Sequence, residues 1–221
     1  MIKLLKLAKP NVLEANAVAW TKTLVDKINL GIKLTDTEKT KYRHPDIKDA
    51  LVKETHGKCA YCESKLLHIH HGDVEHIYPK SLDPNKTFDW DNLTLACEVC
   101  NQFKSNHDPN MLHIIDPYNI DPATHINFIG TIVHAVTADY GQSTKSILKL
   151  NRAELCERRR EKLEKTLSIF ENILNQTLSL ATRKAIYEDL LENEGGSASE
   201  YSAMNIAAIR QLQNRLEEGF F

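Results

Sequence analysis

Two pairs of cysteines carry the most specific chemistry in this 221-residue sequence. Cys59 and Cys62 form one C-x-x-C pair, and Cys97 and Cys100 form a second. A two-residue spacing lets both thiolates of a pair face one ion, and four thiolates complete the tetrahedral shell that structural zinc prefers. The binding free energy of such a site is on the order of 10–16 kcal/mol, comparable to the stability of a whole domain. We therefore expect a structural zinc ion that largely determines the fold of this segment.

Two other interpretations of these cysteines are ordinary buried thiols and a thioredoxin-like redox couple. The presence of two pairs in one short segment favours a metal site over both. Five cysteines in a chain of this length also fit the reducing cytoplasm better than a disulfide framework. The fifth, Cys156, is interpreted as a small core residue of a helix, with a redox or ligand role as the alternative.

Acidic, histidine and asparagine residues lie between the two cysteine pairs and on both sides of the second pair. DVEHIYPKS (Asp73–Ser81) stands between the cysteine pairs, and WDNLTLACEVCNQFKS (Trp90–Ser105) contains the second pair. Hydrolysis of a phosphodiester needs a base that deprotonates water and a cation that neutralises charge on the phosphate and the departing oxygen. Neighbouring strand residues point to opposite sides, so a kink or loop must direct Glu75 and His76 to one site. Pro79 cannot donate to a sheet ladder and fits the end of such a strand.

The order of acid, histidine, proline, asparagine and a last asparagine after the second cysteine pair resembles the HNH (ββα-metal) endonuclease family. In that family two strands and a helix enclose one divalent cation. The resemblance implies that His76 is the general base, that Glu75 and Asn101 are metal ligands, and that Asn92 fastens the connecting loop. Oxygen ligands favour a hard ion, magnesium first and manganese next. Many relatives have histidine at the position of Asn101.

Three further charged residues of the motif have open roles. Asp73 is either a further ligand of the catalytic ion or an acid that orients one, or else a solvated carboxylate at the end of a strand. Lys80 and Lys104 are candidate nucleic-acid contacts through backbone phosphates, with solvated surface as the alternative.

Other residues of these types favour less specific interpretations. His68, His70 and His71 are interpreted as part of a surface loop, with a second metal site or phosphate contacts as alternatives. Trp90 is expected to fill the small core rather than to stack on a base. The basic run Arg158–Arg160 is interpreted as a solvated helix face, with a phosphate or acidic partner as the alternative.

A narrower resemblance rests on four segments, which are HGKCAYCES, VEHIYPKS, IIDPYNIDPATHINF and KSILKLNRAELCERRR. Together they resemble the PtuB family of HNH proteins, which is associated with Septu-type and retron anti-phage systems, over about residues 45–160. The resemblance implies a nuclease effector that acts beside a PtuA-type ATPase. A net charge of only -2 agrees with this, because such a nuclease would rely on a partner for affinity. The Phe220-Phe221 end and the long C-terminal helix are candidate docking surfaces, with core packing as the alternative.

These observations predict a metal-dependent HNH nuclease that hydrolyses nucleic acid, DNA in preference to RNA. One alternative is a catalytically silent, zinc-stabilised subunit that binds nucleic acid or the ATPase. Another is a regulatory subunit that holds the ATPase and has only latent nuclease activity. The joint presence of Glu75, His76, Asn92 and Asn101 argues against a loss of catalysis.

The N-terminal region has the apolar periodicity of helices. Asn11 and Glu14 form a capping-box pattern, and apolar residues recur at helical spacing until Gly31 supplies a stop. A second helix is expected from Pro45 to Gly57, where it delivers the chain to the first cysteine pair.

The rest of the chain is expected to alternate short strands and helices. Strand pieces are predicted at 74–78 and 93–95, and a small hairpin is predicted around Gly130. Asn151 and Glu154 form a second capping-box pattern before a long amphipathic helix. Shorter helices are expected over 183–191 and 201–216.

The predicted fold is α+β and mainly helical, with a small zinc-stabilised ββα-metal core between N-terminal and C-terminal helices. We expect four parts, which are an N-terminal helical segment (1–57), the HNH core (58–110), a turn and hairpin extension (111–142) and a C-terminal helical region (143–221). We expect neither a membrane span nor a signal peptide, because no long apolar run is present.

Overall fold

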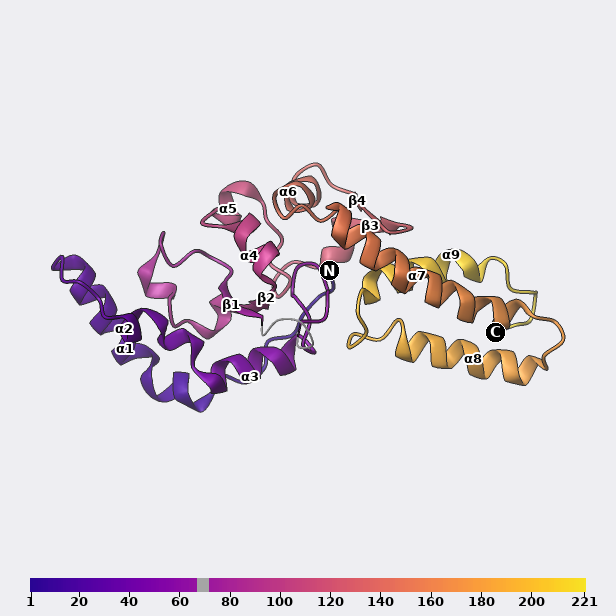
Figure 1. The fold of residues 1–221 in the computed structure, drawn as a ribbon, viewed down its shortest axis with the longest axis horizontal. Coiled ribbons are helices and arrows are strands. Elements are labelled where there is room, and N and C mark those ends of the chain that lie inside the picture. Colours follow the sequence, from indigo (N-terminus) through magenta and orange to yellow (C-terminus); the bar gives the residue numbers. More distant parts are fainter. Residues whose placement is uncertain (67–71) are drawn as a thin grey trace. The chain divides into compact units, whose positions relative to one another are not determined.

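The computed structural model describes residues 1–66 and 72–221 (Figure 1). Its contacts divide the chain into two compact units, one of residues 3–120 and one of residues 1–2 with 121–221. Helices dominate both units, and the described residues also form two small antiparallel sheets, so the mainly helical α+β fold is confirmed. None of the described helices is long and apolar enough to cross a membrane. His68, His70 and His71 lie outside the described residues.

The first unit begins with helices that precede the cysteine pairs. They are α1 (Asn11–Asn29), α2 (Asp36–Thr40), the 3₁₀ helix η1 (Lys41–Arg43) and α3 (Pro45–Glu54). The two helices predicted from Asn11 and from Pro45 are confirmed. The capping box predicted at Asn11 is wrong. Pro10, with an extended backbone, stands at the N-cap, and no side chain caps the helix. The complete capping box instead joins Thr35 and Glu38 at the start of α2.

A two-stranded sheet and a helix form the centre of this unit (Figure 1). Strand β1 (Asp73–His76) pairs antiparallel with β2 (Leu93–Ala96), and α4 (Glu98–Lys104) follows β2 and packs on β1. Gly72 enters β1 with a φ of +68°, and a Cβ there would lie 2.9 Å from side-chain atoms of Leu66 and Leu95. Glycine is therefore required both by the left-handed backbone and by the lack of space for a side chain beside β2.

A buried polar cluster attaches the N-terminal segment to this sheet. The ammonium group of Lys6 donates to the carbonyl of Leu93 at 2.5 Å, lies 3.2 Å from Glu54, and sits 4.0 Å from the ring centroid of Trp90. Glu54 also accepts hydrogen bonds from the Leu7 amide at 2.9 Å and from the Tyr118 hydroxyl. Trp90 is 2% exposed, so the expectation that it fills the core is confirmed.

The remaining short elements of the first unit are η2 (Pro84–Lys86), η3 (Trp90–Asn92) and α5 (Pro109–Leu112).

The second unit contains a hairpin followed by helices. After η4 (Pro122–Thr124) come β3 (Ile126–Ile129), β4 (Ile132–Ala135), α6 (Tyr140–Ile147), α7 (Ala153–Leu174), α8 (Leu180–Asn193) and α9 (Ser202–Gln213). The hairpin turns at Gly130, as predicted, with a φ of +57°. The predicted cap at Asn151 is wrong, because its amide is used elsewhere. It binds the backbone N–H and carbonyl of Val133 at 2.8 and 2.9 Å, which ties β4 to the start of α7.

The three long helices of this unit enclose an apolar core. Its buried members are Phe170, Ile173, Tyr187, Leu190, Ile209 and Phe220. Phe220 therefore packs in the core, whereas Phe221 is 74% exposed. The expectation of a fully solvated basic run on α7 is wrong at Arg159, which is buried and donates to the carbonyls of Leu150 and Thr131. Arg158 and Arg160 are exposed and pair with glutamates of their own helix.

Candidate active site and metal centre

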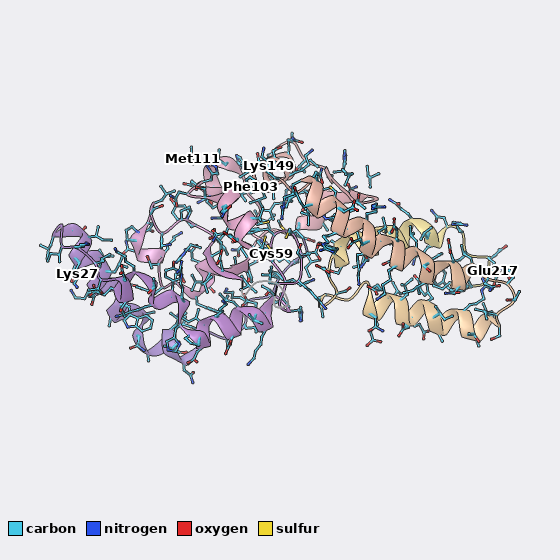
Figure 2. The ribbon with its side chains drawn as sticks, in the orientation of Figure 1. Lys27, Cys59, Phe103, Met111, Lys149 and Glu217 are labelled. Carbon is cyan, nitrogen blue, oxygen red and sulfur yellow. The ribbon has the colours of Figure 1, made fainter. Side chains whose placement is uncertain are left out.

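The two C-x-x-C pairs bring four thiols together. The sulfur atoms of Cys59, Cys62, Cys97 and Cys100 all lie within 4.8 Å of one another, and those of Cys62 and Cys97 are 3.9 Å apart. Figure 2 labels Cys59, the first of the four along the chain. Tetrahedral coordination at a Zn–S distance of about 2.3 Å places sulfurs about 3.8 Å apart. The cluster therefore matches a four-thiolate zinc site and is far too wide for a disulfide, since bonded sulfurs lie about 2.05 Å apart.

Local hydrogen bonds favour the thiolate form, which a metal requires, at Cys62 and Cys97, whereas the pKa of Cys59 is raised by burial and that of Cys100 by its bonds to the other thiols. The backbone N–H of Cys100 donates to the sulfur of Cys97 at 3.3 Å, and the hydroxyl of Ser64 lies 3.3 Å from the sulfur of Cys62. Hydrogen bonds from the neighbouring thiols, Cys100 first, lower the pKa of Cys62 well below its usual value. The donor set and its hydrogen bonds therefore fit a bound zinc ion.

The cluster joins the elements that carry the other candidate residues. The first pair is attached to β2, because the amide of Ala60 donates to the carbonyl of Leu95 at 2.9 Å. The second pair spans the start of α4, with Cys97 at the N-cap and Cys100 in the first turn. Asn101 follows directly in the same helix, so an ion held by the thiols would also fix the position of Asn101 relative to the sheet.

His76 ends β1 as a buried imidazole, only 4% exposed. Its Nε2 lies 3.0 Å from the carbonyl oxygen of Thr87, and its ring meets the ring of Tyr42 edge-on at 4.6 Å. A carbonyl only accepts hydrogen bonds, so Nε2 carries the proton and Nδ1 keeps a lone pair. Burial, followed by the positive charge of Lys80, lowers the pKa of His76 to about 3. The imidazole is therefore neutral at neutral pH, with Nδ1 as the proton acceptor.

Asn92 organises the loop that returns from β1 to β2. Its amide nitrogen donates to the carbonyls of Tyr78 at 2.9 Å and Lys86 at 3.0 Å, and its amide oxygen accepts from the N–H of Tyr78 at 2.7 Å. The side chain is thus bonded to both ends of the loop. Because Thr87 directly follows Lys86, these bonds also hold the carbonyl that fixes the ring of His76.

The opposite face of β1 contacts α4 through two polar pairs. Asp73 accepts a hydrogen bond from the amide nitrogen of Asn101 at 3.0 Å, and Glu75 lies 2.8 Å from the ammonium group of Lys104. Lys104 also donates to the carbonyl of His76 at 2.8 Å. Burial raises the pKa of Glu75, and the charge of Lys104 acts in the opposite direction. Residues two apart on a strand and three apart on a helix share a face, which explains why the pairs stand next to each other.

The oxygen atoms on this face could hold a hard divalent cation. Asp73 and Glu75 supply carboxylates, and the amide of Asn101 supplies a carbonyl oxygen, which are the ligand types that magnesium and manganese prefer. In the structure the ammonium group of Lys104 balances the charge of Glu75. These oxygen ligands therefore suit a divalent cation, and Lys104 lies beside them.

The structure separates the predicted residues into two groups. Asp73, Glu75, Asn101 and Lys104 meet between β1 and α4, whereas the ring of His76 contacts the ring of Tyr42 and the carbonyl of Thr87. Among the described residues no contact joins that ring to the side chains of the first group. Lys104 is 1% exposed, in contrast to the open phosphate contact that its position in the sequence suggested.

Three contributors to the site escaped the sequence analysis. Thr87 acts through its backbone carbonyl, which no residue type reveals. Tyr42 covers His76 from η1, and Arg43 beside it is among the charges that lower the pKa of His76. The stretch Lys41–Arg43 lies between two helices and has no spacing pattern that would connect it with a site some thirty residues further along.

Comparison with known proteins defines the class to which this arrangement belongs. Residues 59–107, which contain both cysteine pairs, β1, β2 and α4, match the model of the HNH endonuclease family. The chain therefore contains an HNH-type domain in this segment.

The similarity extends beyond that domain. The chain is 32% identical to the "Septu protein PtuB" of Bacillus thuringiensis and 26% identical to that of Bacillus mycoides (strain KBAB4), in each case over 72% of this chain. The aligned region covers 66% of the length of each relative. The chain therefore resembles PtuB-type proteins over most of its length.

Replacement of one thiol tests the metal centre. Cys59→Ser should lower the zinc content from about one ion per four-cysteine site and should destabilise the first unit, because the metal stabilises its fold. Elemental analysis and thermal unfolding measure both effects. Cys156→Ser is the matched control, since Cys156 lies outside the cluster, and an equal zinc content in both variants would contradict the assignment.

Replacement of Asn92 tests the loop attachment. Asn92→Ala removes three part-buried hydrogen bonds and should lower the free energy of unfolding by about 1 kcal/mol for each of them. Urea unfolding measures the change. Asn85→Ala is the control in the same loop, because among the described residues the exposed Asn85 side chain bonds only to Asp83. Similar losses in both variants would contradict the role of Asn92.

Proposed function

We propose that this chain is a metal-dependent HNH nuclease that hydrolyses phosphodiester bonds of nucleic acid, with His76 as the general base. The observation that carries the proposal is the hydrogen bond between Nε2 of His76 and the carbonyl of Thr87. It leaves Nδ1 as a lone-pair acceptor on a neutral ring, which is the state that a base needs before it deprotonates water. The match of residues 59–107 to the HNH family supports the same reaction.

The hydrogen bond between His76 and Thr87 persists after proton transfer, although burial and the positive charge of Lys80 disfavour a charged ring. When Nδ1 accepts a proton, the ring becomes a cation, and the Thr87 carbonyl remains its hydrogen-bond acceptor on the opposite nitrogen. The edge-on ring of Tyr42 and the bonds of Asn92 keep the imidazole from rotating away. These residues therefore orient the base without taking part in proton transfer themselves.

Asp73, Glu75 and Asn101 are proposed to hold the catalytic cation, magnesium in preference to manganese. When bound, such an ion neutralises negative charge on the scissile phosphate and the departing oxygen. Lys104 positions Glu75 and the end of β1, because its ammonium group contacts both the carboxylate and the carbonyl of His76. Lys80 is exposed and is proposed to contact phosphate directly.

The PtuB-type resemblance supports a wider proposal about the biological role. We infer an effector of a Septu or retron type of anti-phage defence that works in the cytoplasm beside a PtuA-type ATPase. DNA is the proposed substrate in preference to RNA. A net charge of -2 supports dependence on a partner, since such a chain gains little affinity for nucleic acid from its overall charge.

One observation favours a second candidate, a catalytically silent zinc-stabilised subunit that binds nucleic acid or the ATPase. The ammonium group of Lys104 already neutralises Glu75 at 2.8 Å, which is how a site without a divalent ion would balance this buried carboxylate. The two candidates differ in whether the purified protein, alone or with the ATPase, cleaves nucleic acid when magnesium is added.

Replacement of His76 tests the proposed reaction. His76→Ala should lower the rate of magnesium-dependent cleavage by about 10²–10⁴, the usual contribution of a general base. The zinc content should stay at the parent value, because His76 lies outside the thiol cluster. His134→Ala is the control at an exposed histidine of β4 and should cleave as the parent does. A His76→Ala protein as fast as the parent would exclude the mechanism.

A further inference from the structure

Two positively charged side chains flank the tyrosine that covers His76. The guanidinium carbon of Arg43 lies 5.4 Å from the ring centroid of Tyr42, and the ammonium group of Lys80 lies 4.9 Å from the same centroid. Lys80 also lies 3.4 Å from the Tyr42 hydroxyl. Tyr42 is 4% exposed, whereas Arg43 and Lys80 are exposed. Two solvent-exposed cations therefore lie against one buried ring.

These cations come from separate parts of the first unit. Arg43 belongs to η1, and Lys80 follows β1 by four residues in the loop that Asn92 fastens. The contact of Tyr42 with the imidazole, at 4.6 Å between ring centroids, brings both cations next to the proposed base. The fold therefore concentrates positive charge beside His76 although the chain as a whole is slightly acidic.

Within residues 1–66 and 72–221 neither cation forms an ion pair with an acidic side chain, although the charge of Lys80 acts on the carboxylate of Glu75. Other basic residues of the same unit do have one, since Lys22 pairs with Asp26 at 2.7 Å and Lys27 with Glu38 at 2.5 Å. A cation over the face of an aromatic ring gains only about 0.5–1 kcal/mol at an exposed site, and it keeps its full charge. Arg43 and Lys80 thus remain available to an anion from solution.

We propose that Arg43 and Lys80 bind the phosphodiester backbone of the nucleic acid next to the bond that is cleaved. The inference rests on the proposed function and extends it to a residue of the N-terminal helical region. A planar guanidinium binds two phosphate oxygens at once, and an ammonium group acts as a point charge, so the pair matches the charge and geometry of a phosphodiester backbone. Binding through this site is independent of sequence and decreases with salt.

The test measures binding in the His76→Ala background, with fluorescent mixed-sequence duplexes of DNA and of RNA as probes. Arg43→Ala and Lys80→Ala should each reduce the dependence of log affinity on log salt by about one, and the double variant by about two. At about 0.1 M salt each of these substitutions should weaken binding roughly tenfold. The double variant Lys33→Ala/Lys53→Ala changes net charge equally at exposed lysines of the same unit and should bind as the background protein does.

The outcomes separate this inference from the proposed reaction. Reduced affinity and salt dependence for either duplex support the phosphate site, and the duplex that binds more tightly identifies the nucleic acid. Equal affinity and salt dependence in the two double variants would overturn the site. Cleavage by the His76→Ala protein at the parent rate would instead reject the nuclease mechanism and leave the binding result standing.

Discussion

The hydrogen bond between His76 and the carbonyl of Thr87 constrains the rest of the active site. A buried imidazole can serve as a base only if its proton is held on one nitrogen, so the loop that supplies the carbonyl must be fixed. Asn92 fixes that loop by bonds to both of its ends. Tyr42 packs edge-on against the ring, and burial of the ring is the main cause of the low pKa of His76.

The other face of β1 depends on the four-thiol cluster. The cluster connects the chain before β1 with the first turn of α4, and α4 then places Asn101 and Lys104 against Asp73 and Glu75. A four-residue strand buries too little apolar surface to hold this arrangement, whereas a structural zinc site supplies folding free energy directly. Thiol cluster, strand and helix therefore form one unit, which carries the proposed base at the end of β1 and the proposed oxygen ligands between β1 and α4.

The sequence predicted the parts of the site that have a spacing pattern. The thiol cluster follows from two C-x-x-C pairs, and the sheet and hairpin follow from alternation and turn residues. The sequence did not predict the burial of Lys104, because a lysine in the last turn of a short helix is normally solvated. Only the position of Glu75 explains why the Lys104 side chain is buried against β1. The Asn151 cap failed for a similar reason, since a distant backbone group competes for its amide. Contacts between separate segments, such as Tyr42 with His76, have no local signature.

The tautomer of His76 is the most direct test of the account. Nitrogen-15 NMR of the ring in the parent protein distinguishes the two neutral tautomers and the cation, with His76→Ala used to assign the signals. We predict a neutral ring at neutral pH with its proton on Nε2 and an unprotonated Nδ1. A proton on Nδ1, or a fully protonated ring under the same conditions, would contradict the assignment of His76 as the base.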